Sequence, residues 1–292
     1  MIIPFIKAHG AGNDFLFTFA SHLPAVTQLA NAQLASIARA ICHRNTGIGA
    51  DGWYLIEMPP DPGGAGLPRI RLWNSDGSYA GLSGNGTRCV AAILASRGLA
   101  GDPVRILTGA GERILHRRPP ESETDRSLWF EMEMGAPQIG AVRFPLPLAA
   151  GEREVTILDV GNPQCVLAVE EFPPDWTALA AEIEGHPHFP SRTNVSLIRA
   201  LDPHTIEARF YERGAGHTLS SGTGSTGAAA AAILLDLVKS PVTVRTEFGP
   251  LYIRTGEVPI TDGGTVWLTG PAEEIGTGQF LFLDADRFAL AT

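Results

Sequence analysis

The sequence predicts an α+β protein made of two related halves, each with short strands around a central helix. Two stretches, 83–92 and 221–230, both have the order Ser-Gly-x-Gly followed by small residues, and they lie about half a chain apart. Each continues as an alanine-rich run without a polar face, which is typical of a helix buried on all sides. Flanking segments alternate between apolar and polar residues and predict strands in antiparallel or mixed sheets.

Periodicity and terminating residues define the expected elements. The first central helix is expected at 83–98, since glycine commonly ends a helix, and the second at 221–239. Two further helices are expected at 29–41 and 175–183. Strands are expected at 69–73, 128–132, 154–158, 205–211, 242–245 and 265–268. The polar, turn-rich segment 119–127 is expected to mark a domain boundary.

The composition excludes several classes of protein. The chain has 292 residues, enough for two domains of ordinary size, and 44% of them are hydrophobic, as in globular proteins. The formal net charge is −9 with no basic stripe, which argues against nucleic-acid binding. The longest apolar run, 228–235, is too short for a membrane helix, and residues 1–7 lack the features of a signal peptide. We therefore expect a cytoplasmic protein that binds neither nucleic acid nor membranes.

The cysteines give no sign of a disulfide framework or a metal site. Cys42, Cys89 and Cys165 are odd in number and widely spaced. Neither a paired disulfide pattern nor the close spacing of zinc ligands is present, so no metal is expected.

The two Ser-Gly-x-Gly turns are the main candidates for a functional site. A glycine-rich turn that opens a helix presents free backbone N–H groups at the positive end of the helix dipole, which suits it to bind an anion. We expect both helix N-termini to face one cleft and to bind one carboxylate from two sides. The alternative is that Ser83 and Ser221 are only N-caps, a common role of serine. The residues alone leave both interpretations open.

Other turns rich in glycine and asparagine are weaker candidates when each is taken alone. They lie at 9–15, 44–52, 74–77, 161–163, 192–195 and 212–216. Residues 47–52 fit the Gly-x-Gly-x-x-Gly pattern, but not within a strand-to-helix turn followed by an acidic residue about 20 positions on. A dinucleotide site is therefore not predicted.

In this order, the segments resemble the diaminopimelate epimerase family of the cofactor-independent amino-acid racemase superfamily. The family pattern HGxGNDF, GxGAD, NxDGS, CGNGxRC, GNPH, RTNV, ERGxGET and CGTG is matched at 9–15, 47–51, 74–78, 84–89, 161–163, 192–195, 212–216 and 222–224. The resemblance implies two pseudo-symmetric domains, each a mostly antiparallel sheet curled around a central helix, with the substrate between them. The expected domains are 1–125 together with 276–292, and 126–275.

The resemblance also implies a reaction, the inversion of LL- to meso-diaminopimelate without a cofactor. Such an inversion needs a base on one face of the α-carbon and an acid on the other, and the family supplies both with thiols at helix N-termini. Here both thiol positions are hydroxyls, and the expected catalytic residues are Ser83, Ser221 and Glu212. The expected partner is a small amino-acid substrate, and a homodimer is compatible with the resemblance.

Two further departures fall near this chemistry. The histidine that supports the acid/base pair in the family is Gln164, and the glutamate of the GET segment is His217, which we expect near Ser221. The residues implied to bind substrate are retained. Those for its distal amino and carboxylate groups are Asn13, Asn74, Asn162, Asn194, Glu212 and Arg213. Those for its α-carboxylate are Gly84, Asn85, Gly222 and Thr223.

Three hypotheses follow from this combination. The first is a diaminopimelate epimerase, favoured by the retained distal-binding residues. The second is a related amino-acid isomerase or dehydratase that uses hydroxyl residues, favoured by the paired serines, because a hydroxyl is a far weaker acid than a thiol. The third is a catalytically silent paralogue that binds a diamino-diacid.

Overall fold

A computed structural model describes residues 1–23, 29–60, 66–120, 122 and 124–283. Residues 121 and 123 of the expected boundary segment, and 284–292 of the expected first domain, lie outside this range. Contacts divide the chain into two compact units. Unit 1 contains Met1–Gly10, Asp14–Leu128 and the chain from Ala272 onward, and unit 2 contains Ala11–Asn13 and Trp129–Pro271.

Unit 1 is a curled sheet of mostly antiparallel strands with two helices. Its elements are β1 (Ile2–Gly10), β2 (Asn13–Phe19), η1 (Ala20–His22), α1 (Asn31–Cys42), β3 (Gly52–Glu57), β4 (Arg69–Asn74), β5 (Tyr79–Ala80), α2 (Gly84–Ser96), β6 (Val104–Thr108), β7 (Gly111–Arg118) and the end of β17 (Val266–Leu281). β2 and β3 form a parallel pair joined through α1, and β4 and β6 form another joined through α2. β3 pairs antiparallel with β4, β6 with β7, and β1 with the end of β17.

Unit 2 repeats this order of helices and strand pairs. Its elements are β8 (Leu128–Gly135), β9 (Gln138–Leu146), β10 (Arg153–Asp159), β11 (Pro163–Ala168), α3 (Trp176–Glu184), β12 (Asn194–Asp202), β13 (Thr205–Glu212), β14 (Gly216–Thr218), α4 (Gly222–Leu234), β15 (Val242–Arg245), β16 (Pro250–Thr255), η3 (Ile260–Asp262) and the start of β17. β11 and β12 are parallel through α3, and β13 and β15 are parallel through α4, while β12–β13 and β15–β16 are antiparallel. The matching topology confirms the two related halves and the predicted fold class.

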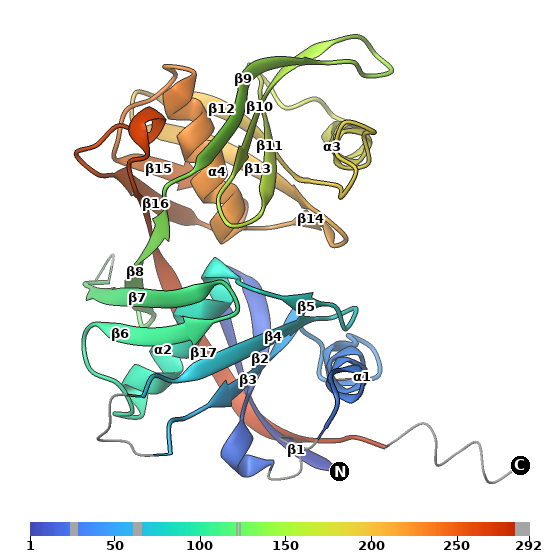
Figure 1. The fold of residues 1–292 in the computed structure, drawn as a ribbon, viewed down its shortest axis with the longest axis vertical. Helices are drawn as coiled ribbons and strands as arrows, with labels where there is room; N and C mark the ends of the chain where they lie inside the picture. The colour runs from blue at the N-terminus through green and yellow to red at the C-terminus, as the bar shows by residue number, and fades with distance from the viewer. Residues whose placement is uncertain (24–28, 61–65, 121, 123, 284–292) are drawn as a thin grey trace, which may run out of the picture. The chain divides into compact units, whose positions relative to one another are not determined.

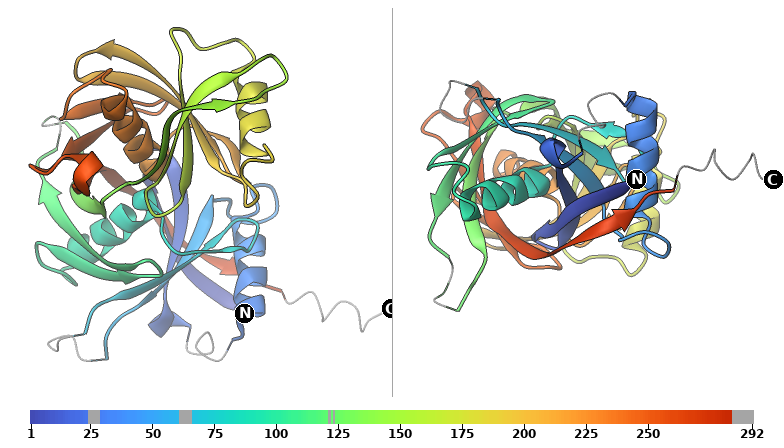
Figure 2. Two further views of the ribbon diagram at one scale, coloured as in Figure 1. Left: turned by 45° about the horizontal axis from the view of Figure 1, so that its top comes forward. Right: turned by 90° about the horizontal axis from the view of Figure 1, so that it is seen from below.

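The central helices α2 and α4 are enclosed by the strands of their own units (Figure 1 and Figure 2). Residues 84–94 of α2 and 222–232 of α4 are all buried. Small side chains allow this enclosure, because neighbouring groups approach the helix backbone closely. A Cβ atom added at Gly224 would lie 2.7 Å from the ring of Phe210. The predicted central helices are thus confirmed, and their burial follows from the lack of a polar face.

The other two helices each bury one face. α1 packs Leu34, Ile37 and Ile41 into a cluster with Trp53 and Trp73. α3 packs its apolar face into the corresponding cluster of unit 2, which includes Trp176, Ala180, Ile183, Val195 and Leu197. Both helices begin within two residues of the predicted starts. Among the described residues, no helix has both the length and the apolar character needed to cross a membrane.

The predicted end of the second central helix at Lys239 is wrong, because α4 ends at Leu234. Asp236 adopts a left-handed conformation with φ of 58°, and the Leu237 N–H donates to the carbonyl of Ala232 at 2.9 Å. This closing bond is the usual C-terminal cap in which a left-handed residue follows the helix. In unit 1 the equivalent left-handed position after α2 is Gly98, the residue predicted to end that helix. Asp236 therefore ends α4 in the same conformation in which Gly98 ends α2.

A network of charges holds the start of β2 against the loop that precedes β3. Asp14 is bound by Lys7 at 2.9 Å and by Arg44 at 2.8 Å, and Arg44 also binds Asp51 at 2.7 Å. Burial raises the pKa of Asp14, but hydrogen bonds and charge from Arg44 and Lys7 outweigh this effect, so its pKa is lowered overall. Two glycine-containing motif segments are therefore fixed to one another inside unit 1.

We expect Asp14→Asn to lower the free energy of unfolding at pH 7 by about 1–3 kcal/mol, since hydrogen bonds to a charged group are lost. Because the pKa of Asp14 is lower in the folded state, its contribution is complete above the unfolded-state pKa and is lost as the pH falls through the folded-state pKa. The variant should therefore lose stability less steeply below about pH 5. Urea unfolding across pH measures both effects.

The matched control is Glu154→Gln, which removes a carboxylate from a pair with Arg143 in which both side chains are more than half exposed. Its free energy of unfolding should change by no more than about 0.5 kcal/mol. Equal acid profiles for wild type and Asp14→Asn would contradict the assigned role of Asp14.

Candidate active site

Both candidate serines cap their helices in the same geometry. The Ser83 hydroxyl oxygen accepts a hydrogen bond from the Gly86 N–H at 3.2 Å, and that of Ser221 accepts one from the Gly224 N–H at 3.0 Å. Both serines have extended backbones, as N-caps usually do. The capping role of both serines is therefore confirmed. It does not exclude chemistry, because each hydroxyl also lies at the positive end of a helix.

The Ser221 hydroxyl has a carboxylate partner. Its Oγ donates a hydrogen bond to Glu212 Oε1 at 2.7 Å, and Ser221 is only 4% exposed. Glu212 ends β13, and the tight turn to β14 pairs it with Gly216 just before the chain enters α4. A hydroxyl bound to a carboxylate can pass its proton to that group, so this pair is equipped for proton transfer.

A chain of amides runs from a buried glutamine to the first turn of α4. The side chain of Gln164 donates from Nε2 to Asn162 Oδ1 at 2.6 Å, and Asn162 donates from Nδ2 to Thr223 Oγ1 at 3.2 Å. Gln164 is completely buried on β11. It cannot relay a proton as a histidine could, but it fixes the direction in which Asn162 presents its amide.

Arg213 and Asn194 are joined through the backbone. The Arg213 N–H donates to Asn194 Oδ1 at 3.0 Å, and Asn194 Nδ2 donates to the Pro163 carbonyl at 2.9 Å. The exposed guanidinium of Arg213 donates from Nη1 to the Ser191 carbonyl at 3.1 Å. Its remaining N–H groups have no partner within the described part of the chain and are available to a carboxylate.

Glu184, the last residue of α3, was not predicted as part of this region. Its buried carboxylate forms an ion pair with Arg192 and accepts a hydrogen bond from the Gly214 N–H at 3.4 Å. It thereby connects two of the motif segments in unit 2. In the sequence it resembles an ordinary acidic residue at the end of a helix, and only its burial distinguishes it.

Gly84 and Asn85 form the first turn of α2. Asn85 is buried, and its side-chain oxygen accepts a hydrogen bond from Arg88 Nη2 at 2.6 Å. A Cβ atom added at Gly10 would lie 2.8 Å from the Asn85 carbonyl oxygen. The end of β1 therefore packs directly against this helix start, and the glycine at position 10 permits that approach.

The other two candidate asparagines lie at the ends of strands. Asn13 begins β2, directly after a turn in which Ala11 and Gly12 both have positive φ, of 50° and 81°. Asn74 ends β4 and donates from its side chain to Ser78 Oγ at 3.0 Å, within its own turn. The hydrogen bonds of unit 2 thus join several candidates to one another, whereas that of Asn74 is local.

The ring of His217 pairs with a residue other than Ser221. His217 Nε2 lies 2.5 Å from Glu247 Oε2, and the ring packs edge-on against Trp176. Ser221 binds Glu212 instead. His217 is the middle residue of β14, which ends at Thr218, before the start of α4 at Gly222.

The cysteines pack in the core. Cys42, Cys89 and Cys165 are all buried and unpaired, and burial raises the pKa of each thiol to about 12. Such thiols are poor acids and bases near neutral pH. These cysteines therefore do not replace the two catalytic thiols of the family pattern, whose positions are occupied here by Ser83 and Ser221. Within the described range, no group of three or more His, Cys, Asp or Glu side chains is arranged to hold a metal ion.

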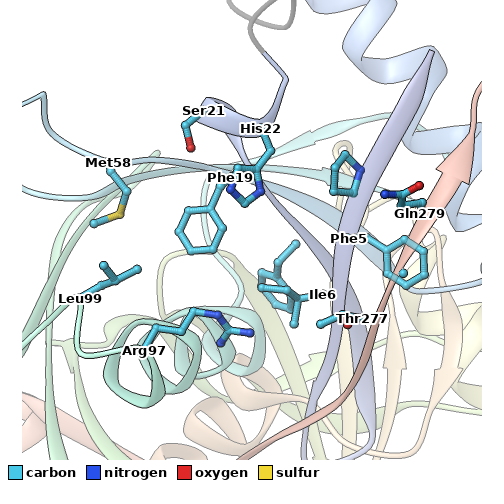
Figure 3. A pocket seen from close by; sticks show the side chains of 13 residues that line it. Phe5, Ile6, Phe19, Ser21, His22, Met58, Arg97, Leu99, Thr277 and Gln279 are labelled. Carbon is cyan, nitrogen blue, oxygen red and sulfur yellow. The ribbon is translucent and has the colours of Figure 1, made fainter.

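A separate cavity of about 630 Å³ lies in unit 1 (Figure 3). It is bordered by β1, β2, η1, the end of α2 and β17, and Figure 3 shows Ile6, Phe19 and Arg97 around it. No described residue that lines it is one of the predicted site residues. Arg97, the charged residue at its edge, is already paired with Glu274 at 2.7 Å. The cavity therefore does not mark the candidate active site.

Solved structures share this fold. A phenazine biosynthesis protein of the PhzF family from Bacillus anthracis is similar with a TM-score of 0.73 and 15% identity, over 97% of this chain and 100% of that protein. A hydroxyproline epimerase from Agrobacterium vitis is similar with a TM-score of 0.68 and 15% identity, over 95% of this chain and 90% of that protein. At this identity the likeness shows the fold alone.

Sequence comparison identifies the family. The sequence model of the diaminopimelate epimerase family matches residues 5–139 and 156–273. A relative from Pelotomaculum thermopropionicum, named diaminopimelate epimerase, is 36% identical over 294 residues, which cover 94% of this chain and 98% of that relative. A second, from Moorella thermoacetica and of the same name, is also 36% identical, over 94% of this chain and 98% of its own length. The chain therefore belongs to the diaminopimelate epimerase family.

Proposed function

We propose that this protein interconverts LL- and meso-diaminopimelate without a cofactor, in the synthesis of lysine and peptidoglycan precursors. The observation that carries the proposal is the hydrogen bond of 2.7 Å between Ser221 and Glu212 at the start of α4. It gives one candidate hydroxyl the neighbouring base that a serine needs for proton transfer. The names of the relatives in the same family support the choice of substrate.

The proposed reaction uses one hydroxyl from each unit. Ser221 removes the α-proton from one face of the substrate while its own proton passes to Glu212. Ser83 supplies a proton to the opposite face of the α-carbon, which inverts the centre, and the reverse reaction exchanges these roles. Backbone N–H groups at the helix starts stabilise the negative charge that develops on the α-carboxylate between the two transfers.

The binding residues divide into two groups in this proposal. Gly84, Asn85, Gly222 and Thr223 hold the α-carboxylate at the helix N-termini. Asn13, Asn74, Asn162, Asn194, Glu212 and Arg213 hold the distal amino and carboxylate groups. The outward guanidinium of Arg213 supports this division, because its free N–H groups fit a carboxylate in a two-point contact. The paired serines favour a second candidate, a hydroxyl-based isomerase or dehydratase acting on another amino acid.

Calorimetry with dialysed, chelator-treated protein tests the substrate. We expect both LL- and meso-diaminopimelate to bind without added metal or pyridoxal phosphate. Arg213→Ala should weaken binding by about 1.5–3 kcal/mol, the range for charge-assisted hydrogen bonds. Arg153→Ala, which removes an exposed guanidinium from β10, is the control and should leave affinity unchanged. No binding of either stereoisomer, or binding restored only by metal, would count against the proposal.

Glu212→Gln tests the observation that carries the proposal. The amide retains a hydrogen-bond acceptor for Ser221 but is not a base, so exchange of the substrate α-proton in deuterated water should slow by about 10²–10⁴-fold. Diaminopimelate binding should change far less, because the loss falls on proton transfer. An exchange rate equal to that of wild type would remove Glu212 from the mechanism.

The serine pair itself makes a rate prediction. A hydroxyl pKa lies far above neutral pH, so wild-type epimerisation should be slow, and Ser83→Cys combined with Ser221→Cys should accelerate it. Adding Gln164→His should accelerate it further by supplying a proton relay. If wild type already matches these variants, the serines do not limit the rate. If no variant exchanges the α-proton while binding persists, the site is adapted to other chemistry or to binding alone.

A further inference from the structure

Tyr54 carries a buried hydroxyl that the proposed mechanism does not yet use. It lies on β3 in unit 1 and is 1% exposed, and its ring stacks on Phe17 at 5.0 Å and meets Phe15 edge-on. Within the described residues, its hydroxyl makes no hydrogen bond of standard geometry. An unsatisfied buried polar group costs roughly 1–3 kcal/mol, so a phenylalanine here would be expected on grounds of stability alone.

The hydroxyl of Tyr54 lies beneath the first turn of α2. A Cβ atom added at Gly86 would lie 2.2 Å from Tyr54 Oη, so this approach requires the glycine. The N–H of Gly86 is the group that caps Ser83 Oγ at 3.2 Å. Burial raises the pKa of Tyr54, with a contribution from Cys89, and the nearby hydroxyls of Ser83 and Thr87 lower it only in part. The phenol therefore keeps its proton and is available as a donor.

The two serines differ in their surroundings. Ser221 has the carboxylate of Glu212, and the equivalent glycine of its turn, Gly224, lies against Phe210, a ring without a hydroxyl. Ser83 has no carboxylate partner in the described part of unit 1, and the aromatic ring against its turn is a tyrosine. The unit without a carboxylate is thus the one with a phenol.

We propose that Tyr54 is a positioning residue that donates a hydrogen bond to Ser83 Oγ when that oxygen carries negative charge. This inference rests on the proposed role of Ser83. When Ser83 gives its proton to the substrate α-carbon, its O–H bond breaks, a C–H bond forms, and the electron pair stays on Oγ. The Gly86 N–H and the Tyr54 O–H then both stabilise the alkoxide, and no proton leaves Tyr54.

A donor placed for a charge that exists only during the reaction explains why the Tyr54 hydroxyl lies close to the hydroxyls of Ser83 and Thr87 but makes no hydrogen bond of standard geometry among the described residues. Stabilisation that appears in the charged state accelerates the step, whereas an equal interaction with the neutral hydroxyl would not. The arrangement compensates in part for the weak acidity of a hydroxyl relative to a thiol. The rival acceptor is Thr87, whose own hydroxyl already donates to the Ser83 carbonyl at 2.8 Å.

Tyr54→Phe separates these roles because stability and rate should move independently. Removing an unsatisfied hydroxyl should leave the unfolding midpoint unchanged or raise it. Exchange of the diaminopimelate α-proton should nevertheless slow by about 10–100-fold with KM little changed, the loss of one hydrogen bond to a charged oxygen. Tyr79→Phe, which removes an exposed phenol from the same sheet, is the control and should change neither. A lowered unfolding midpoint with an unchanged rate of α-proton exchange would mean that the Tyr54 hydroxyl stabilises the fold by donating to Thr87. That result would overturn the proposal.

A second measurement needs no substrate. Ser83→Cys places a titratable thiol at the position, and the pH dependence of its alkylation by iodoacetamide gives its pKa, while the three native cysteines are buried. Adding Tyr54→Phe should raise that pKa by about 1–2 units, because a donor to the thiolate is lost. An unchanged thiol pKa would overturn the proposal. A raised pKa in a protein that never exchanges the diaminopimelate proton would uphold Tyr54 and reject the proposed function.

Discussion

The need to bury a helix that has no polar face determines the architecture of each unit. α2 and α4 are rich in small residues and are buried along most of their length, and antiparallel neighbours joined by parallel crossovers achieve that enclosure. Only the N-terminal turns of these helices combine polar groups with unbonded backbone N–H groups. The same constraint that builds the core therefore sets the place of the proposed chemistry, with one serine hydroxyl at the start of each enclosed helix.

Close packing at those turns also brings an aromatic ring against the turn that follows each serine. Gly86 admits the phenol of Tyr54, and Gly224 admits the ring of Phe210. The two turns are alike in backbone and capping, yet one is accompanied by a hydroxyl and the other by the carboxylate of Glu212. A duplicated scaffold thus carries two chemically different surroundings at the starts of its two central helices.

The sequence predicted those features that depend on local composition. The central helices and all six expected strands are present, because alternation and small-residue runs are local signals. It missed strands such as β2, where Phe15–Phe19 are buried throughout and no alternation is visible. The motif resemblance identified Glu212 and Arg213, but Tyr54 and Glu184 lack a local signal, because only their burial in the folded chain distinguishes them from ordinary residues of a strand and of a helix end.

Strand β17 pairs with a strand that is synthesised long before it, which affects when unit 1 can complete its sheet. Its final residues pair with β1 from Ile2 to His9, so β1 acquires this neighbour only after the whole of unit 2 has been synthesised. In unit 2, by contrast, strand pairs such as β9–β10 and β15–β16 can form before the end of β17 has been synthesised. Until β17 has been synthesised, this edge of β1 is a site for wrong pairing with other nascent chains. Removal of the paired end of β17, from Gly276 to Leu281, should thus destabilise unit 1 first.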